Sequence, residues 1–153
     1  MATSSLISNV SPNGNTYDMQ RTQVIERTID FGNLPAGVTK AIADVINVLA
    51  IPAGTVVVAV GAQVVTADTT GASPTVSLGD GASGIQFSSA GVNPKAAAGT
   101  VVLSAASTWK MYSSVGLINM TINTAALTNA VLRIFAIVVD CKRSDDSRQL
   151  NVV

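Results

Sequence analysis

Histidine is absent from this chain of 153 residues. Because histidine is the commonest general base at neutral pH and the commonest neutral metal ligand, most familiar active sites are excluded with it. No G-x-S-x-G sequence is present to form the nucleophile elbow of a serine hydrolase. We therefore expect a protein that is not an enzyme, with no catalytic residue, no metal-binding residue and no cofactor.

Carboxylates do not replace the missing histidine. A glycosidase needs two acids that face each other across a sugar, and Asp68 and Asp80 are the candidates in neighbouring loops. Asp68 lies shortly before Gly71 and Asp80 directly before Gly81, which is typical of turns in which aspartate bonds nearby backbone amides. A calcium loop needs several more oxygen ligands than the segment around Asp80 provides. Both aspartates are therefore predicted to be turn residues.

Charge is scarce and unevenly distributed. Nine basic and nine acidic residues cancel, so nucleic acid is not expected as a partner. Between Leu49 and Trp109 the charged residues are Asp68, Asp80 and Lys95 alone. Because natural sheets usually protect exposed edges with charge, this stretch favours assembly with other subunits. The alternative is a surface of small polar residues that is adequately hydrated without charge.

The sequence also contains little cysteine and no long hydrophobic run. Cys141 is the only cysteine, so no intrachain disulfide can form, and its alternating apolar surroundings predict a small buried side chain. The richest apolar stretch, Ile51 to Val65, is short and interrupted by proline and glycine, so no membrane span is expected. The N-terminus lacks the basic segment and apolar core of a secretory signal, which predicts a cytoplasmic product.

The abundant residues favour β-strands. Valine, isoleucine and threonine make up 47 of the 153 residues, and β-branched side chains suit pleated strands better than helices. Alternating apolar residues between turn-rich segments predict strands at Val24–Phe31, Asp44–Ile51, Val56–Ala67, Thr75–Leu78, Gly84–Phe87, Thr100–Ser104, Ser114–Asn123 and Ala130–Lys142. Eight or nine strands with no long helix predict one all-β domain, a jelly-roll-like β-sandwich of residues 21–142.

Two of these strands need comment. The segment Val38 to Ile51 also fits helical spacing, but the turn that follows it, with Pro52 and Gly54, favours a strand. The strand Val56–Ala67 is apolar on both faces, which predicts a central strand covered on both sides.

Both ends of the chain depart from the strand pattern. Residues 1–20 are rich in Ser, Asn, Thr and Gly, and residues 143–153 are mostly polar. Neither segment can bury enough apolar surface to order itself, so we predict an extended N-terminal arm and a C-terminal tail. Leu6, Ile7 and Val10 are the apolar residues by which the arm is predicted to contact a partner.

The only concentrated aromatic group is Trp109 to Tyr112. Exposed aromatic side chains anchor protein interfaces or stack on sugars, so Trp109 and Tyr112 are also predicted partner contacts. The alternative, and for Trp109 the favoured one of the two, is that this side chain fills one end of the sandwich.

Several short motifs resemble a plan that recurs among small structural proteins of tailed phages. In that plan a Pro-Ala-Gly turn opens a long strand, here Val48–Val57, and a Leu-Gly-Asp-Gly strand follows, here Val76–Gly81. An aromatic loop at Met111–Tyr112 and an apolar closing strand at Ile118–Ile122 complete it. The resemblance covers about Asp44 to Asp140 and is to capsid decoration (cement) proteins and head-fibre-like proteins with a β-sandwich domain.

The resemblance implies assembly on a virion, commonly as a homotrimer, and it carries over no functional residue. The resulting hypothesis is a cement protein, made in the host cytoplasm, that stabilises the phage head by binding between capsid subunits. Its expected partners are other copies of the chain and the major capsid protein, with no nucleic acid and no membrane. Two alternatives stay open: a fibre or tip module that binds a host surface glycan, and a shell or tail structural subunit.

Overall fold

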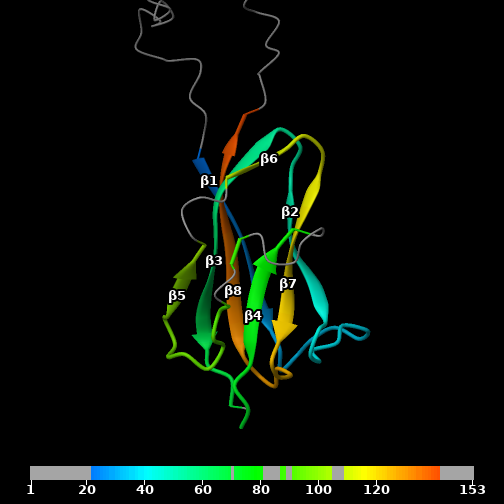
Figure 1. Cartoon of the computed structure of the whole chain (residues 1–153), viewed down its shortest axis with the longest axis vertical. Coiled ribbons are helices and arrows are strands. Elements are labelled where there is room, and N and C mark those ends of the chain that lie inside the picture. Colours follow the sequence, from blue (N-terminus) through cyan, green and yellow to red (C-terminus); the bar gives the residue numbers. More distant parts are fainter. Residues whose placement is uncertain (1–21, 70, 81–86, 89–90, 105–108, 142–153) are drawn as a thin grey trace, which may run out of the picture.

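The computed structural model describes residues 22–69, 71–80, 87–88, 91–104 and 109–141. Within these ranges the chain forms eight β-strands (Figure 1). The strands are β1 (Thr22–Asp30), β2 (Val45–Ile51), β3 (Thr55–Thr66), β4 (Thr75–Gly79), β5 (Val101–Leu103), β6 (Lys110–Tyr112), β7 (Gly116–Asn123) and β8 (Val131–Asp140). A search of these residues finds no helix with the length and apolarity needed to cross a membrane.

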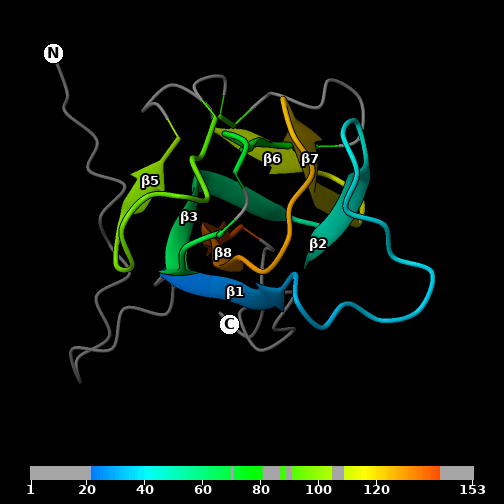
Figure 2. The same cartoon turned by 90° about the horizontal axis from the view of Figure 1, so that it is seen from below.

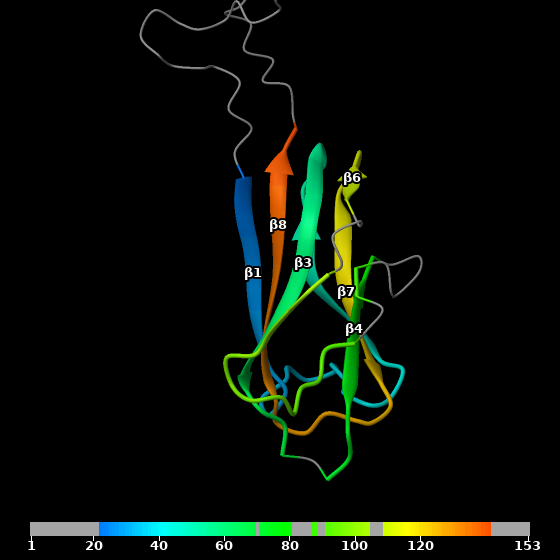
Figure 3. The ribbon, with the colours of Figure 1, turned by 60° about the vertical axis from the view of Figure 1, so that its left-hand side comes forward.

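The strands form two antiparallel sheets that pack against each other (Figures 2 and 3). The larger sheet has the order β1-β8-β3-β5, with β6 also paired to β3, and the smaller sheet has the order β2-β7-β4. The pairings β1 with β8, β2 with β7 and β3 with β6 are nested, first strand with last. Nested pairing across two sheets is the arrangement of a jelly roll. The predicted all-β, jelly-roll-like sandwich is confirmed.

Alternation along the strands places the core between the two sheets. Every second residue of the two longest closing strands is buried: Leu132, Ile134, Ala136 and Val138 on β8, and Ile118, Met120 and Ile122 on β7. These side chains meet across the space between the sheets, where they bury most of the apolar surface of the fold. Alternate side chains of the closing strands point inward as predicted, because successive side chains on a strand point to opposite faces of the sheet.

The predicted strands match β1, β2, β3, β4, β5, β7 and β8 to within a few residues. The segment that also fitted a helix forms strand β2. Of the predicted strand Gly84–Phe87, residues 84–86 lie outside the described residues, and Phe87 is buried in a bend. Strand β6 was missed because Lys110–Tyr112 is short and contains no β-branched residue, whereas β5, which is equally short, has the sequence Val-Val-Leu.

Cys141 is half-buried, so the prediction of a buried thiol is wrong. Strand β8 ends at Asp140, and Cys141 is the first residue to leave the sheet. Its backbone N–H still donates a hydrogen bond to the carbonyl of Gly54, at 2.8 Å.

Candidate interaction surfaces

The two aspartates considered for chemistry lie on either side of β4 in the chain. Oδ2 of Asp68 accepts a hydrogen bond from the backbone N–H of Thr128 at 2.8 Å, which ties the turn after β3 to the turn before β8. Asp80 directly follows the other end of β4, so the two carboxylates do not face one another. In the part of the chain that the structure describes, no three His, Cys, Asp or Glu side chains gather to hold a metal ion. Asp68 is thus a turn residue, whereas Asp80 belongs to a buried cluster.

The outer face of the larger sheet is largely apolar toward the end of β8, whereas Thr28, Gln63 and Arg133 lie on its other half. Because cross-strand partners in an antiparallel sheet point to the same side, the register identifies the side chains that share this face. We call the following residues the outer-face patch: Val24, Val56, Ala59, Leu103, Met111, Phe135, Ile137 and Val139. All are exposed or half-buried, and they come from all five strands of the sheet. Contiguous apolar surface of this kind typically marks an interface.

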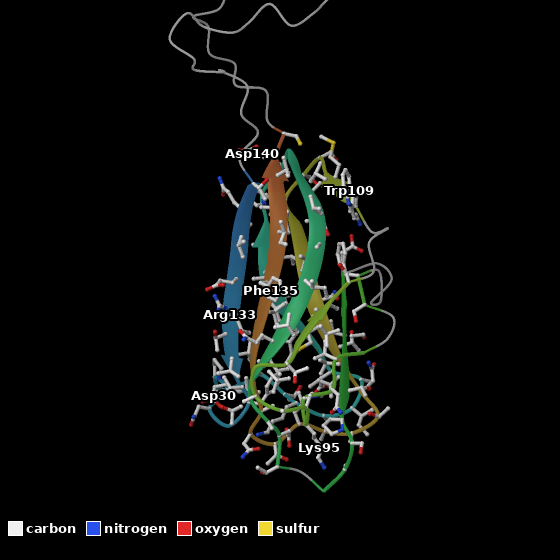
Figure 4. All side chains as sticks on the ribbon, turned by 90° about the vertical axis from the view of Figure 1, so that its left-hand side faces the viewer. Asp30, Lys95, Trp109, Arg133, Phe135 and Asp140 are labelled. Atoms are coloured by element: carbon white, nitrogen blue, oxygen red, sulfur yellow. The ribbon has the colours of Figure 1, made fainter. Side chains whose placement is uncertain are left out.

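Phe135 lies at the edge of the outer-face patch, next to the row of Arg133, on the side of the sheet that Figure 4 presents. Its cross-strand partner on β3 is Gly61. A Cβ at Gly61 would lie 2.6 Å from Cζ of Phe135 and 3.0 Å from Cδ2 of Leu103, so these two side chains fill the space above the glycine. The aromatic ring therefore links β8 to the edge strand β5 across the backbone of β3.

One ion pair borders the outer-face patch. Nε of Arg133 donates a hydrogen bond to Oε2 of Glu26 at 2.9 Å, and both side chains lie on the outer face. An exposed pair of this kind contributes only about 0–1 kcal/mol to stability. Its more important effect is that the two charges cancel beside the patch, so that a complementary surface needs to be apolar and neutral.

The outer face of the smaller sheet is mostly polar. The register of β2 and β4 with β7 places these residues on it: Val45, Asn47, Ala50, Thr75, Ser77, Gly79, Leu117, Asn119, Thr121 and Asn123. Several of its polar groups bond to one another, as Nδ2 of Asn123 does to Oγ of Ser77 at 3.2 Å. Ser77 and Asn119 on this face are buried, so part of it is already covered, whereas every residue of the outer-face patch is exposed or half-buried.

A second set of exposed apolar side chains flanks β6: Trp109 directly precedes this strand, and Val115 and Leu117 lie at its connection to β7 and at the start of β7. Trp109 is 70% exposed, Val115 is 71% exposed, and Leu117 is also exposed. We call these three residues the β6–β7 tip; Figure 4 shows Trp109 at the same end of the molecule as Asp140. Trp109 does not fill the end of the sandwich, so that alternative is wrong. Contact between Trp109 and a partner stays a prediction.

Tyr112 is directed inward and is only 7% exposed. Its hydroxyl donates a hydrogen bond to Oδ2 of Asp80 at 3.3 Å, and Nζ of Lys110 forms an ion pair with the same oxygen. This cluster ties the end of β4 in the smaller sheet to β6 in the larger one. A direct contact between Tyr112 and a partner, as predicted from the sequence, would require the ring to leave the core; Tyr112 instead supports the β6–β7 tip from inside.

Gly116 makes room for the Tyr112 ring. A Cβ at Gly116 would lie 2.0 Å from Cδ1 and 2.1 Å from Cε1 of Tyr112, so the ring occupies the space of the missing side chain. Sequence reasoning missed this contact, because a glycine at the start of a strand is indistinguishable from a turn glycine until its neighbour is known.

Alkaline pH is expected to destabilise the domain through Tyr112. Burial raises the pKa of the Tyr112 phenol above its usual value of 10.0. Since the folded state holds the proton more tightly than the unfolded state, this contribution to stability is complete below the unfolded pKa and is lost as the pH rises through the folded pKa. Urea denaturation at a series of alkaline pH values should show a steeper loss of unfolding free energy for the wild type than for Tyr112→Phe. Parallel pH profiles would contradict this assignment.

The remaining predicted contacts lie outside the described residues. They are Leu6, Ile7 and Val10 of the N-terminal arm, residues 1–20. The C-terminal tail, residues 143–153, also lies there. Their roles stay predictions.

The fold recurs in solved structures of phage capsids. A chain of the cyanophage Pam1 capsid asymmetric unit matches with a TM-score of 0.65 and 18% identity, over 90% of this chain and 97% of that chain. The capsid of Ralstonia phage GP4 gives a TM-score of 0.58 and 19% identity, over 82% and 89%. The acid-stable capsid of Helicobacter pylori bacteriophage KHP30 gives 0.52 and 20%, over 76% and 86%. No family model and no curated protein sequence matches the chain.

At 18–20% identity these chains share a fold with the present one. The chain spans at least 86% of each matched chain, so the likeness concerns whole chains rather than a common fragment. The class that the fold defines is a jelly-roll-like sandwich of the kind found in phage capsid structures. The resemblance to structural proteins of phages, predicted from short motifs, is confirmed at the level of the fold.

Proposed function

We propose that this protein is a non-enzymatic structural component of a bacteriophage particle, a decoration (cement) protein that binds between capsid subunits and stabilises the head. The observation that carries the proposal is the outer-face patch, an apolar surface that spans five strands of the larger sheet. Such a surface is unfavourable in water unless another protein covers it. The recurrence of the fold in three phage capsid structures supports a phage particle as the setting of this assembly.

The partner on the outer-face patch is a second copy of the same chain. The ion pair of Glu26 and Arg133 is satisfied within one copy, so two copies can approach without unpaired charge at this position. In a homotrimer, the oligomer that the resemblance implies, each copy presents the patch to a neighbour and the ring closes by symmetry. The charge-poor stretch between Leu49 and Trp109 includes β3 and β5, which supply three residues of the patch.

An oligomer of this kind stabilises a capsid by mass action. Contacts between the oligomer and several capsid subunits exist only in the assembled shell, so binding favours the assembled state over the dissociated one. Because one oligomer makes several linked contacts, the first contact to form raises the effective concentration for the contacts that form after it.

Capsids that lack this protein are expected to release their DNA at a lower temperature than decorated capsids. The measurement is the fluorescence of a DNA-binding dye during heating of both kinds of particle, with purified protein added back as the control. Restoration of the higher release temperature by added protein supports the proposal. Equal release temperatures would contradict a stabilising role.

A second candidate function is glycan recognition by a fibre or tip module. It is favoured by the exposed indole ring of Trp109, which could stack on a sugar. Because Tyr112 is buried, the tip presents one aromatic ring and not the pair that the sequence suggested. Glycan-array binding that is lost in Trp109→Ala, together with a low copy number per particle, would favour this candidate; a high copy number favours decoration or a shell subunit.

A further inference from the structure

We infer that the domain binds the capsid through the end that carries the β6–β7 tip. In this orientation Trp109, Val115 and Leu117 contact an apolar, uncharged area of the shell protein. This inference rests on the proposed function and adds to it the surface that binds and the orientation of the bound domain.

The chemistry of the tip identifies the chemistry of its partner. Trp109, Val115 and Leu117 expose apolar side chains, and the chain from Met111 to Leu117 contains no charged residue. Lys110, the charged residue next to Met111 in the sequence, forms an ion pair with Asp80, and Asp140 is a further charged residue at this end of the domain. A surface that covers the tip therefore gains by burying its own apolar atoms, and it needs no compensating charge.

Both termini of the described domain lie at the same end as the tip. Asp140, the last residue of β8, pairs with Thr55, and Thr55 also pairs with Tyr112 of β6. The first residue of β1, Thr22, pairs with Val139. Figure 1 shows the start of β1 and the end of β8 at one end of the sandwich, beside β6. Residues 1–21 and 142–153 are therefore attached to the domain at the end that carries the tip.

The opposite end of the sandwich carries polar turns. Asp30 and Lys95 mark this end in Figure 4. The carboxylate of Asp30 accepts hydrogen bonds from the backbone N–H of Gly32 and from Nδ2 of Asn33, both at 2.8 Å. Nζ of Lys40 donates to two backbone carbonyls at 2.7 Å. Polar groups satisfied in this way favour solvent, so the described turns at this end are mainly polar, with Ile42 as an exposed apolar exception.

The tip is also held in position before it binds. The Tyr112 ring packs against Gly116, and its hydroxyl bonds to Asp80 of the other sheet. A connection fixed from both sheets has less conformational freedom to lose on binding, and this increases affinity without any added contact.

Docking by this end brings the flanking segments to the shell as well. Twenty-one residues precede Thr22, and a segment of that length spans at most about 70 Å. Once the tip is bound, these residues are confined near the shell at a high effective concentration, which favours further contacts with neighbouring subunits. The position of the termini thus makes the tip contact and the predicted arm contacts mutually reinforcing.

Co-sedimentation of the full-length protein with undecorated particles of its own phage tests the inference. Val115→Ser and Trp109→Ser are expected to raise the dissociation constant at least about tenfold, as loss of an interface anchor does. Ile42→Ser is the matched control, because Ile42 is 58% exposed and lies at the opposite end, and it should bind like the wild type. Melting temperatures of all variants establish that the fold is intact.

The possible outcomes separate this inference from the proposed function. Wild-type binding that both tip variants retain in full would overturn the docking orientation and leave decoration standing. A different result would be a tip variant that has a lower mass in solution than the wild type while each oligomer keeps its affinity for the capsid. That result would assign the tip to self-association and would also overturn the inference. Absence of any binding by the wild type would overturn both.

Discussion

Replacement of Gly116 by alanine is expected to destabilise the domain by about 3 kcal/mol, near the upper end for overpacking of a core. The added Cβ would lie 2.0 Å from the Tyr112 ring, far inside van der Waals contact. The ring cannot move outward without exposing a core side chain and breaking the hydrogen bond to Asp80. Urea denaturation monitored by circular dichroism measures the loss.

Gly71→Ala is the control for this substitution. A Cβ at Gly71 would meet no atom within 4 Å, and its φ is not in the left-handed region. Alanine there should leave the free energy of unfolding unchanged or raise it by a few tenths of a kcal/mol, through reduced entropy of the unfolded chain.

A double-mutant cycle identifies the ring as the cause. In a Tyr112→Ala background the space next to Gly116 is empty, so the additional cost of Gly116→Ala should largely disappear. An undiminished cost in that background would show that the glycine is needed for its backbone and not for the ring.

Val24→Lys is expected to dissociate the oligomer. Val24 is a 59% exposed member of the outer-face patch, and in an oligomer closed through this patch a lysine there would bury a charge with no partner. We expect the dissociation constant for self-association to rise at least about 30-fold, equivalent to about 2 kcal/mol. Sedimentation velocity over a range of concentrations measures it.

Val45→Lys is the matched control, because Val45 is 58% exposed and lies on the outer face of the smaller sheet. The same substitution there should change neither the mass in solution nor the melting temperature by much. Equal dissociation by both variants would mean that net charge, not the patch, governs assembly. A wild-type protein that stays monomeric at high concentration would remove the outer-face patch as a self-association surface.

Much of the fold follows from local pattern. The period of two along β7 and β8 identifies strands because one face of each strand is buried and alternate residues must be apolar. The turn between β2 and β3 is equally predictable, since Pro52 fixes its own φ and Gly54 readily adopts the positive φ of 76° found there. Features of this kind depend on residues close together in the sequence.

The candidate surfaces were less accessible to sequence reasoning. Trp109 and Tyr112 were grouped because they are close in sequence, yet one is exposed and the other buried. Residues three apart on an extended strand point to opposite sides, so recognition of β6 would have separated them. Asp80 is brought to Tyr112 by packing of the two sheets, and Gly116 by the fold of the short β6–β7 connection, and no strand pattern encodes either contact.

Residue pattern and composition alone predicted a β-sandwich, the positions of most strands and the absence of histidine chemistry. They did not determine which apolar face of β3 and β8 belongs to the core. Both faces of β8 are apolar: Ile134 and Ala136 alternate with Phe135 and Ile137. The sequence predicted cover on both sides of β3, whereas among the described residues the smaller sheet covers one side and the other carries the outer-face patch. Only tertiary structure decided this, because a three-stranded sheet can cover one face of a larger sheet, and alternation along a strand does not say which.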